Sequence, residues 1–299
     1  MISKYNLTRP HPAELATLAI LAVVTATLCL SLVTGSALLK PLLFHAGLLA
    51  GFVVLVGFLA SHPGAGWVFP LRGVAVTGVM FTLYSTLGHI AFDAIPWLAD
   101  PALDVADRAL FLGNSPALWA SQPQPRTVEF LSFFYGAYIP YLYISILLGL
   151  VARPPAEREE FVTAFALLYA LSFLGYLFLP ARGPIVELAA QFPGDLRGAT
   201  FHRMVVSAID RMGGPHGAFP SLHVGATFLV VWFDLRHHNL LRGLIYVPLL
   251  LLIAVATIVL RYHWVVDLIA GATLALLAHR LAPVLVARWQ RPGLQGTQP

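Results

Sequence analysis

Charged residues are scarce in this sequence. Only 11% of its 299 residues are Asp, Glu, Lys or Arg, whereas 58% are hydrophobic, and the mean hydropathy is +0.78. Soluble globular domains carry about 25% charged residues, so this chain has too few charges to cover a surface that faces water. The composition therefore excludes an ordinary soluble domain and favours a protein whose surface lies against lipid.

Cysteine is also nearly absent. Cys29 is the single cysteine and lies in an apolar run, so the chain cannot form an intramolecular disulfide and gives no sign of its redox compartment. The formal net charge is +4 and the isoelectric point is near 9.4. Because the basic residues are spread over short connections rather than gathered in one patch, we predict no binding of nucleic acid.

Long apolar runs make up most of the sequence. A helix needs about 20 mainly apolar residues to cross the hydrocarbon core of a bilayer. Eight segments meet this length approximately, the sixth being short: Ala13–Gly35, Pro41–Ala60, Leu71–Leu98, Arg126–Val151, Glu160–Pro180, Ser221–Leu235, Leu241–Leu260 and His263–Val286. The first run is longer than the apolar core of a signal peptide, so we expect a retained span. The sequence thus predicts an all-α fold, a polytopic membrane bundle of about eight transmembrane helices.

Two connections between these runs carry further predictions. The segment 99–125 mixes acidic and apolar residues in a pattern typical of an amphipathic helix in the membrane interface, with Asp100, Asp104 and Asp107 on its wet side. The connection Ala181–Ala218 contains six glycines and three prolines, so we expect it to be irregular. We divide the chain into N-terminal transmembrane helices (1–98), the interfacial segment (99–125), a helical bundle that carries the candidate catalytic motifs (126–290) and a disordered tail (291–299).

The positive charges indicate an orientation. Cytoplasmic connections near the ends of spans are enriched in Lys and Arg. With a cytoplasmic N-terminus, ten of the 18 Lys and Arg residues fall in short connections and tails on the cytoplasmic face. The others fall on the opposite face, mostly in long loops, where the rule has less weight. We therefore predict a multi-pass protein with both termini in the cytoplasm.

Three polar segments converge on the non-cytoplasmic face of this topology. They are Gly-Tyr-Leu-Phe-Leu-Pro-Ala-Arg-Gly-Pro at 175–184, Gly-Ala-Phe-Pro-Ser-Leu-His at 217–223 and Arg-Tyr-His-Trp-Val-Val-Asp at 261–267. Each lies at the end of a predicted span, so their polar side chains would gather at one depth. Ionisable residues at membrane depth are costly and mark functional sites, so we predict a site here.

The residue types in these segments suit phosphate chemistry. Pro220 and Ser221 lie where a helix begins, and free N–H groups and the positive end of the helix dipole at such a start bind phosphate readily. The Ser221 hydroxyl adds a donor. Arg182 provides a permanent charge and a planar fork that matches phosphoryl oxygens. We therefore predict that Arg182 and Ser221 bind phosphate.

Two histidines supply the reactive groups. His263 and Asp267 are four residues apart, hence on one face if a helix begins at His263. A carboxylate bonded to one imidazole nitrogen makes the other nitrogen a better nucleophile or base. His223, from a different helix, would protonate a leaving oxygen as a general acid. We predict that His223, His263 and Asp267 are catalytic.

These motifs resemble those of a known family. Pro-Ser-x-His followed by His-x-x-x-Asp is similar to the pattern of the type-2 phosphatidic acid phosphatase superfamily of membrane lipid phosphatases and phosphotransferases. The residue sequences at 180–184, 217–223 and 107–116 look most like those of the inositol phosphorylceramide synthase branch. The resemblance implies a six-helix phosphatase-type core. It also implies a phosphohistidine at His263, oriented by Asp267, with His223 as the acid and with no metal or other cofactor.

The sequence departs from the family pattern at three positions. The first motif of the family has a lysine and a proline where this chain has Gly175 and Gly183, and the third motif has an arginine where this chain has Thr257. Two cationic phosphate ligands are therefore missing, and Arg261 or His216 would replace them. We include Arg261 among the predicted phosphate ligands. The departures shift weight from a plain phosphatidic acid phosphatase toward phosphotransfer.

Some of the same residues allow other interpretations. The spacing of His263 and Asp267 also suits a zinc ion, but only His223 or His216 offers a further ligand, so we predict no metal site. The four tyrosines at 135–143 are able to stack on a sugar or inositol, although such aromatics more often pack helices together.

The resulting hypothesis is an integral membrane lipid-phosphate phosphatase or phosphotransferase. It would act through a phosphohistidine on the non-cytoplasmic face, with a phosphorylated lipid in the bilayer as its substrate. One alternative is a headgroup transferase similar to inositol phosphorylceramide synthase. Another, from a different class, is a lipid transporter or flippase that binds the headgroup without cleaving it. Inverted repeats and helices broken at mid-membrane are typical of transporters, whereas this sequence has no internal repeat and its polar groups lie at span ends.

Overall fold

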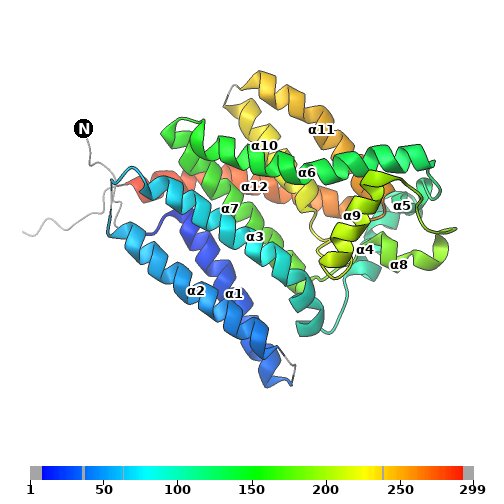
Figure 1. Cartoon of the computed structure of the whole chain (residues 1–299), viewed down its shortest axis with the longest axis horizontal. Coiled ribbons are helices and arrows are strands. Elements are labelled where there is room, and N and C mark those ends of the chain that lie inside the picture. Colours follow the sequence, from blue (N-terminus) through cyan, green and yellow to red (C-terminus); the bar gives the residue numbers. More distant parts are fainter. Residues whose placement is uncertain (1–8, 36–37, 63, 238, 292–299) are drawn as a thin grey trace, which may run out of the picture. The chain divides into compact units, whose positions relative to one another are not determined.

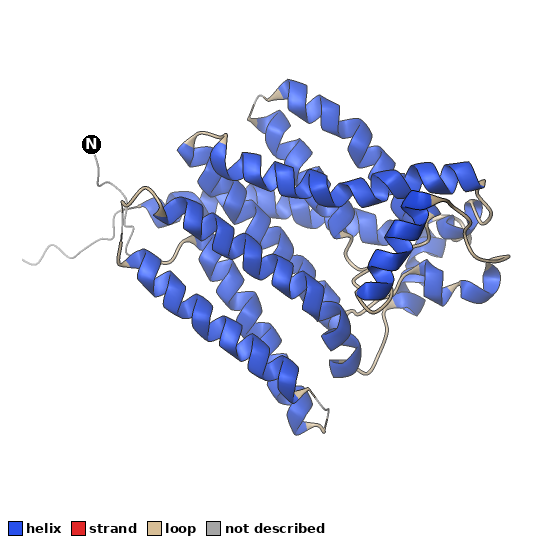
Figure 2. Cartoon of the chain, viewed as in Figure 1, coloured by secondary structure: helices blue, strands red, loops and turns tan. Residues whose placement is uncertain are grey.

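The computed structural model describes residues 9–35, 38–62, 64–237 and 239–291 (Figure 1). These residues form helices joined by loops, and no strand occurs among them (Figure 2). The predicted all-α class is therefore confirmed. The predicted tail at 291–299 lies, from 292 onward, outside the described residues.

The long helices follow the apolar runs. They are α1 (Pro12–Val33), α2 (Leu39–Ala60), α3 (Val68–Ala94), α6 (Pro125–Val151), α7 (Pro155–Phe178), α10 (Leu222–Arg236), α11 (Leu240–Val259) and α12 (Val265–Gln290). In the described part of the chain, seven of these are long and apolar enough to span a membrane. The eighth, α10, has 15 residues and is about 22 Å long, short of the roughly 30 Å of a hydrocarbon core. The chain is thus a multi-pass membrane protein with seven candidate spans rather than eight.

The described chain divides into two compact units. One comprises the described parts of 1–82, 147–170 and 277–299, and the other comprises 83–146 and 171–276. The second unit contains all the candidate site residues.

A buried polar network joins the helices of the first unit. Glu14, in the first turn of α1, pairs with Arg72 of α3 at 2.7 Å, with 1% and 4% of the two side chains exposed. The Arg72 guanidinium also lies 5.8 Å from the centre of the Trp289 ring at the end of α12, and the Trp289 indole donates to the Arg9 carbonyl. Removing one partner of a buried ion pair strands the other charge, so this network fixes α1 against α3.

Two glycines let α10 and α12 approach closely in the second unit. A Cβ atom on Gly271 would lie 2.2 Å from the Ser221 carbonyl oxygen, and one on Gly225 would lie 2.9 Å from the Gly271 carbonyl oxygen. At the same crossing the Ser221 N–H donates to the Asp267 carbonyl at 3.0 Å. The backbones are in direct contact there, and this contact brings the polar ends of the two helices together.

The segment 99–125 is helical as predicted, but two of its three acidic residues do not face water. It forms two helices, α4 (Asp100–Leu110) and the short α5 (Pro116–Trp119). Asp104 is partly exposed and pairs with Arg108 at 2.8 Å. The other two carboxylates are buried, with Asp100 1% and Asp107 0% exposed. The prediction of an aqueous setting was wrong for Asp100 and Asp107 because both accept hydrogen bonds from backbone N–H groups of other segments.

The connection 181–218 is more regular than predicted. It contains α8 (Pro184–Glu187), the short 3₁₀ helix η1 (Ala189–Gln191) and α9 (Thr200–Arg211). The start of α9 is fixed by the Glu129 carboxylate of α6, which accepts from the N–H groups of Ala199, Phe201 and His202. A carboxylate at a helix start satisfies free N–H groups and complements the dipole. A residue of α6 thus caps α9, which local sequence does not reveal.

Candidate active site

His263 lies in the tight reversal between α11 and α12. Arg261 has a φ of +68°, in the left-handed region, and the N–H groups of Tyr262 and His263 both donate to the Thr257 carbonyl, at 2.9 and 3.1 Å. This closes the last turn of α11. Two residues after His263, α12 begins, so His263 precedes the membrane-spanning helix, and it is 3% exposed.

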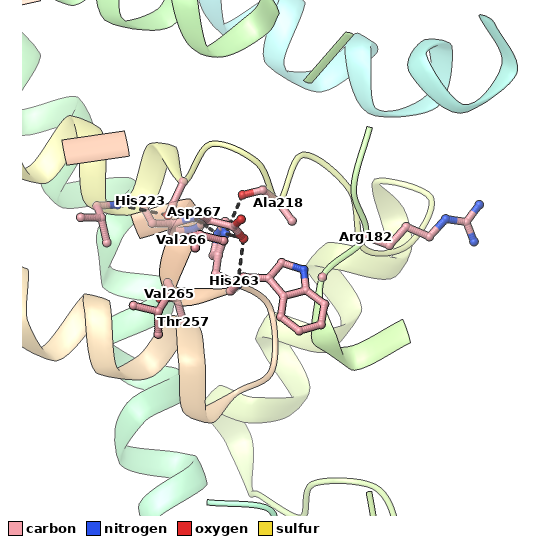
Figure 3. Close-up of polar contacts among 12 residues, drawn as sticks. Arg182, Ala218, His223, Thr257, His263, Val265, Val266 and Asp267 are labelled. Atoms are coloured by element: carbon pink, nitrogen blue, oxygen red, sulfur yellow. Dashed lines mark hydrogen bonds and ion pairs between the residues drawn. The ribbon is translucent and has the colours of Figure 1, made fainter. Parts of the chain in front are cut away.

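One imidazole nitrogen of His263 is held by the protein. Its Nδ1 lies 2.8 Å from the Ala218 carbonyl oxygen and 3.4 Å from the Asp267 carboxylate (Figure 3). A carbonyl only accepts, so Nδ1 carries the proton and Nε2 carries the lone pair. Burial lowers the pKa of His263 to about 4, although the hydrogen bond to Ala218 opposes the shift. The imidazole is therefore neutral near pH 7, with Nε2 available for attack on an electrophile.

His223 presents its Nδ1 to that lone pair. The two atoms are 3.3 Å apart, and because His263 Nε2 can only accept, His223 Nδ1 is the donor. The His223 ring lies against two tyrosines of α6, with ring centres 4.6 Å from Tyr135 and 4.4 Å from Tyr138. The Tyr138 hydroxyl donates to the Leu222 carbonyl at 3.0 Å. This packing fixes a potential proton donor directly opposite a potential nucleophile.

Asp267 lies beside this pair, but its carboxylate also binds a backbone N–H group. Its carboxylate accepts the Trp264 N–H at 2.8 Å, a shorter contact than the 3.4 Å to His263. Hydrogen bonds weaken beyond about 3.2 Å, so the Ala218 carbonyl is the stronger partner of His263. The structure therefore brings His223, His263 and Asp267 together and adds Ala218, which the sequence did not single out.

Arg182 borders the same cavity as the two histidines. Its guanidinium lies 4.7 Å from the centre of the Phe92 ring, and in Figure 3 the side chain extends away from the histidines. His216 and three tyrosines, Tyr84, Tyr135 and Tyr262, also line this cavity. The cavity thus combines one permanent cation, three imidazoles and three tyrosine side chains.

Ser221 lies at the predicted helix start, whereas Arg261 lies away from the histidine pair. The Ser221 side chain is fully buried and accepts from the Val224 N–H, so it caps α10. The Arg261 guanidinium donates to the carbonyls of Gly194 and Ser121, at 2.9 and 2.6 Å, and lies 3.8 Å from the centre of the Phe192 ring. It lines a different cavity from the histidines. The structure does not bring Arg261 to the histidine pair.

The three departures from the family pattern have structural reasons. A Cβ atom on Gly175 would lie 2.4 Å from Cδ of Pro220, so a lysine does not fit there. Gly183 has a φ of +88°, which proline cannot adopt because its ring fixes φ near −65°. The Thr257 side chain is fully buried, and its hydroxyl donates to the Ala254 carbonyl. Glycine suits the close approach at position 175 and the left-handed backbone at position 183, and the Thr257 hydroxyl is satisfied within α11.

The described residues contain no group of three or more His, Cys, Asp or Glu side chains arranged to hold a metal ion. The zinc interpretation of His263 and Asp267 therefore lacks a further ligand within that part of the chain.

Comparison with known proteins agrees with this geometry. The family model of the PAP2 superfamily matches residues 101–281, a range that includes α4 except its first residue, Asp100, together with both histidines and Asp267. A PA-phosphatase related-family protein of Dictyostelium discoideum is 25% identical over 183 residues, which cover 55% of this chain and 33% of that protein. The chain thus matches about a third of the length of this relative. No solved structure matches the chain significantly. Since the family model covers more than half of the sequence, the chain belongs to the PAP2 superfamily.

Proposed function

We propose that this protein is a lipid-phosphate phosphatase that forms a phosphohistidine at His263. The observation that carries the proposal is the 3.3 Å contact between Nε2 of His263 and Nδ1 of His223. A nucleophile needs a lone pair and an acid needs a proton, and the hydrogen bond from His263 to Ala218 supports these roles for the two facing atoms. Membership of a phosphatase superfamily supports the same reaction class.

In the first step, Nε2 of His263 attacks phosphorus and the bond from phosphorus to the ester oxygen breaks. His223 acts as an imidazolium, with a second proton on Nε2 taken up when the anionic substrate binds. Its Nδ1 gives a proton to the departing oxygen, which leaves as a neutral alcohol, and His223 becomes a neutral imidazole. His263 becomes a phosphoimidazole whose Nδ1–H still faces the Ala218 carbonyl and Asp267. The positive charge that develops on the ring is stabilised by the Asp267 carboxylate.

In the second step, water attacks the phosphorus of the phosphohistidine. His223, now a neutral imidazole, takes a proton from this water, and the bond from phosphorus to Nε2 breaks. Inorganic phosphate leaves and both histidines return to their starting protonation. Arg182 is the permanent cation on this cavity, and we propose that it rotates from the Phe92 ring to the phosphoryl oxygens when substrate enters.

The site would face the non-cytoplasmic side, and both termini would lie in the cytoplasm. The distribution of Lys and Arg over the short connections supports this orientation. A lipid would then reach the histidines from the outer leaflet, with its headgroup beneath the 181–218 connection.

The test compares His263→Asn with wild type on a panel of lipid phosphates, pyrophosphates and phosphodiesters in detergent micelles. We expect the variant to lose phosphate release by at least about 10³-fold and to form no acid-labile, alkali-stable phosphoenzyme. His62→Asn changes an exposed histidine of the first unit and is expected to keep full activity. Full phosphate release by His263→Asn would overturn the proposal.

A second candidate is headgroup transfer to a lipid hydroxyl. It is favoured by the aromatic lining of the cavity, where Tyr84, Tyr135 and Tyr262 would contact a polyol. Transfer differs from hydrolysis only in the acceptor, so the same panel with hydroxylated lipids and inositol-containing donors decides between them. A new lipid phosphodiester in place of free phosphate would identify a transferase. Movement of intact labelled lipid, insensitive to His223→Asn, would instead identify a transporter.

A further inference from the structure

The helix α4 contributes two buried carboxylates that no step of the proposed reaction uses. Asp100 and Asp107 are seven residues apart, so they lie on one face of α4 after two helical turns. The carboxylate between them in sequence, Asp104, is partly exposed and pairs with Arg108. Burial of a carboxylate is costly unless hydrogen bonds compensate it, so the partners of Asp100 and Asp107 indicate what these residues do.

Asp100 holds the turn that follows α7. Its two oxygens accept the N–H groups of Arg182 and Gly183, at 2.8 and 2.7 Å. One of them also accepts the indole N–H of Trp264, the residue next to His263, at 3.2 Å. A single buried carboxylate therefore ties the segment that carries Arg182 to the segment that carries His263.

Asp107 holds the start of α12. Its two oxygens accept the N–H groups of Val265 and Val266, at 2.9 and 2.8 Å. These are the first N–H groups of the helix and have no partner within it. Burial raises the pKa of Asp107, and the two backbone hydrogen bonds oppose this shift. The carboxylate thus fixes the backbone directly after His263, across 158 residues of sequence.

The effect of Asp100 extends to the imidazole through backbone groups. The Ala181 carbonyl, adjacent to the Arg182 N–H that Asp100 binds, accepts the Ala218 N–H at 3.2 Å. The Ala218 carbonyl in turn accepts Nδ1 of His263 at 2.8 Å. Asp100 therefore orients the acceptor that fixes the tautomer of His263, while Asp107 fixes the backbone that carries the ring.

We propose that Asp100 and Asp107 are positioning residues that set the orientation of the His263 imidazole against His223 and the substrate phosphorus. The proposal rests on the proposed function, because it takes His263 as the nucleophile. Neither carboxylate lines the histidine cavity, so their effect passes through the backbone. Misplacement of a reacting group by about 1 Å costs about 10²-fold in rate, and these hydrogen bonds determine placement on that scale.

The first test uses Asp100→Asn, Asp107→Asn and the matched control Asp104→Asn in the full chain. Each Asn keeps the shape of Asp but replaces one acceptor oxygen with a donor. On the best substrate of the lipid panel we expect kcat to fall about 10- to 100-fold for the first two variants, with KM within about threefold of wild type. Asp104→Asn should retain wild-type kcat. A loss of thermal stability alone, with kcat unchanged, would overturn the proposal.

A comparison of kcat between Asp107→Asn and Asp107→Ala distinguishes a positioning role from general destabilisation. Asp107→Ala leaves both N–H groups without an acceptor, whereas Asp107→Asn keeps one acceptor oxygen. We expect kcat to fall further for Ala than for Asn, at a temperature where both variants remain folded by circular dichroism. Equal kcat values for Asn, Ala and wild type would overturn the proposal.

The second test does not depend on activity. In protein labelled with ¹⁵N-histidine, the Nδ1–H resonance of His263, assigned with His263→Asn, reports the hydrogen bond to Ala218. We expect this resonance to shift or broaden in Asp100→Asn and Asp107→Asn and to stay unchanged in Asp104→Asn. If wild type releases no phosphate but the resonance responds, the proposed function fails and the positioning stands. If phosphate release is intact and the resonance is unmoved in every variant, the positioning fails and the function stands.

Discussion

Nε2 of His263 lies 3.3 Å from Nδ1 of His223, so the lone pair of one imidazole faces the proton of the other. A phosphorus atom bonded to a leaving oxygen has to enter between these two atoms for the proposed reaction. The rings therefore separate when substrate binds, and the proton that His223 shares with His263 passes instead to the leaving oxygen. The contact predicts different effects from replacing each histidine.

Replacement of His223 is predicted to depend on the leaving group. General acid catalysis contributes about 10²–10⁴-fold, and it matters most when the departing oxygen is a poor leaving group. We expect the reaction rate of His223→Asn to fall by about that factor with a lipid phosphate. With p-nitrophenyl phosphate the rate should fall much less, because p-nitrophenolate is stable enough to leave without a proton. The measurement is the single-turnover rate at which the alcohol or p-nitrophenol is released, because this step precedes the water attack in which His223 acts as the base. Equal losses on the two would remove the acid role from His223, whereas His263→Asn should be inactive with either.

The stability of the protein is predicted to depend on pH through His263. Burial lowers its pKa to about 4, while an unfolded histidine titrates near 6.5. As pH falls from about 6.5 toward 4, the unfolded chain therefore binds a proton that the folded chain does not, and stability decreases. We expect the melting temperature of wild type to fall more between pH 7.5 and 5 than that of His263→Asn. The exposed-residue control His62→Asn should follow wild type, and an identical decrease in all three proteins would contradict the prediction.

The crossing of α10 and α12 is predicted to tolerate no side chain at Gly271. A Cβ atom there would lie 2.2 Å from the Ser221 carbonyl oxygen, and this atom belongs to a backbone that cannot rotate away. Gly271→Ala should therefore separate the two helices, move His223 away from His263 and cost about 1–3 kcal/mol of stability. We expect phosphate release to fall at least about tenfold, since small displacements are costly in rate.

Gly136→Ala is the matched control for this crossing. A Cβ atom at Gly136 would meet only a Val205 methyl group at 3.7 Å, an ordinary contact. Wild-type activity of Gly136→Ala together with wild-type activity of Gly271→Ala would show that the histidine spacing does not depend on the crossing.

The sequence predicts those parts of the molecule that depend on local pattern. Apolar runs predict the long helices, and polar motifs at their ends predict the candidate catalytic pair, because helix length and a His-x-x-x-Asp spacing are properties of neighbouring residues. Asp100 and Asp107 were misassigned to a wet face because their partners are backbone N–H groups 82 to 159 residues away. A seven-residue spacing of two acidic residues on one helix face is a signal that would have indicated a common environment.

The direction of the Arg261 side chain also could not be predicted from the sequence. The missing cations of the family pattern suggested Arg261 as a phosphate ligand, but its φ of +68° and its two carbonyl partners direct the guanidinium into another cavity. Neither a left-handed residue at the end of α11 nor the position of the Gly194 carbonyl follows from residue spacing.

Restoration of the family's lysine is predicted to harm this protein. A Cβ atom at Gly175 would lie 2.4 Å from Cδ of Pro220 and 3.1 Å from the Phe219 carbonyl oxygen, so Gly175→Lys would push the start of α10 and with it His223. We expect lower phosphate release and a lower melting temperature, since overpacking costs about 1–3 kcal/mol. Leu179→Lys places the same charge at an exposed position four residues on and should be tolerated. A higher kcat/KM for Gly175→Lys would contradict this prediction. It would mean that the backbone shifts to admit the lysine and that the added cation binds the phosphoryl group.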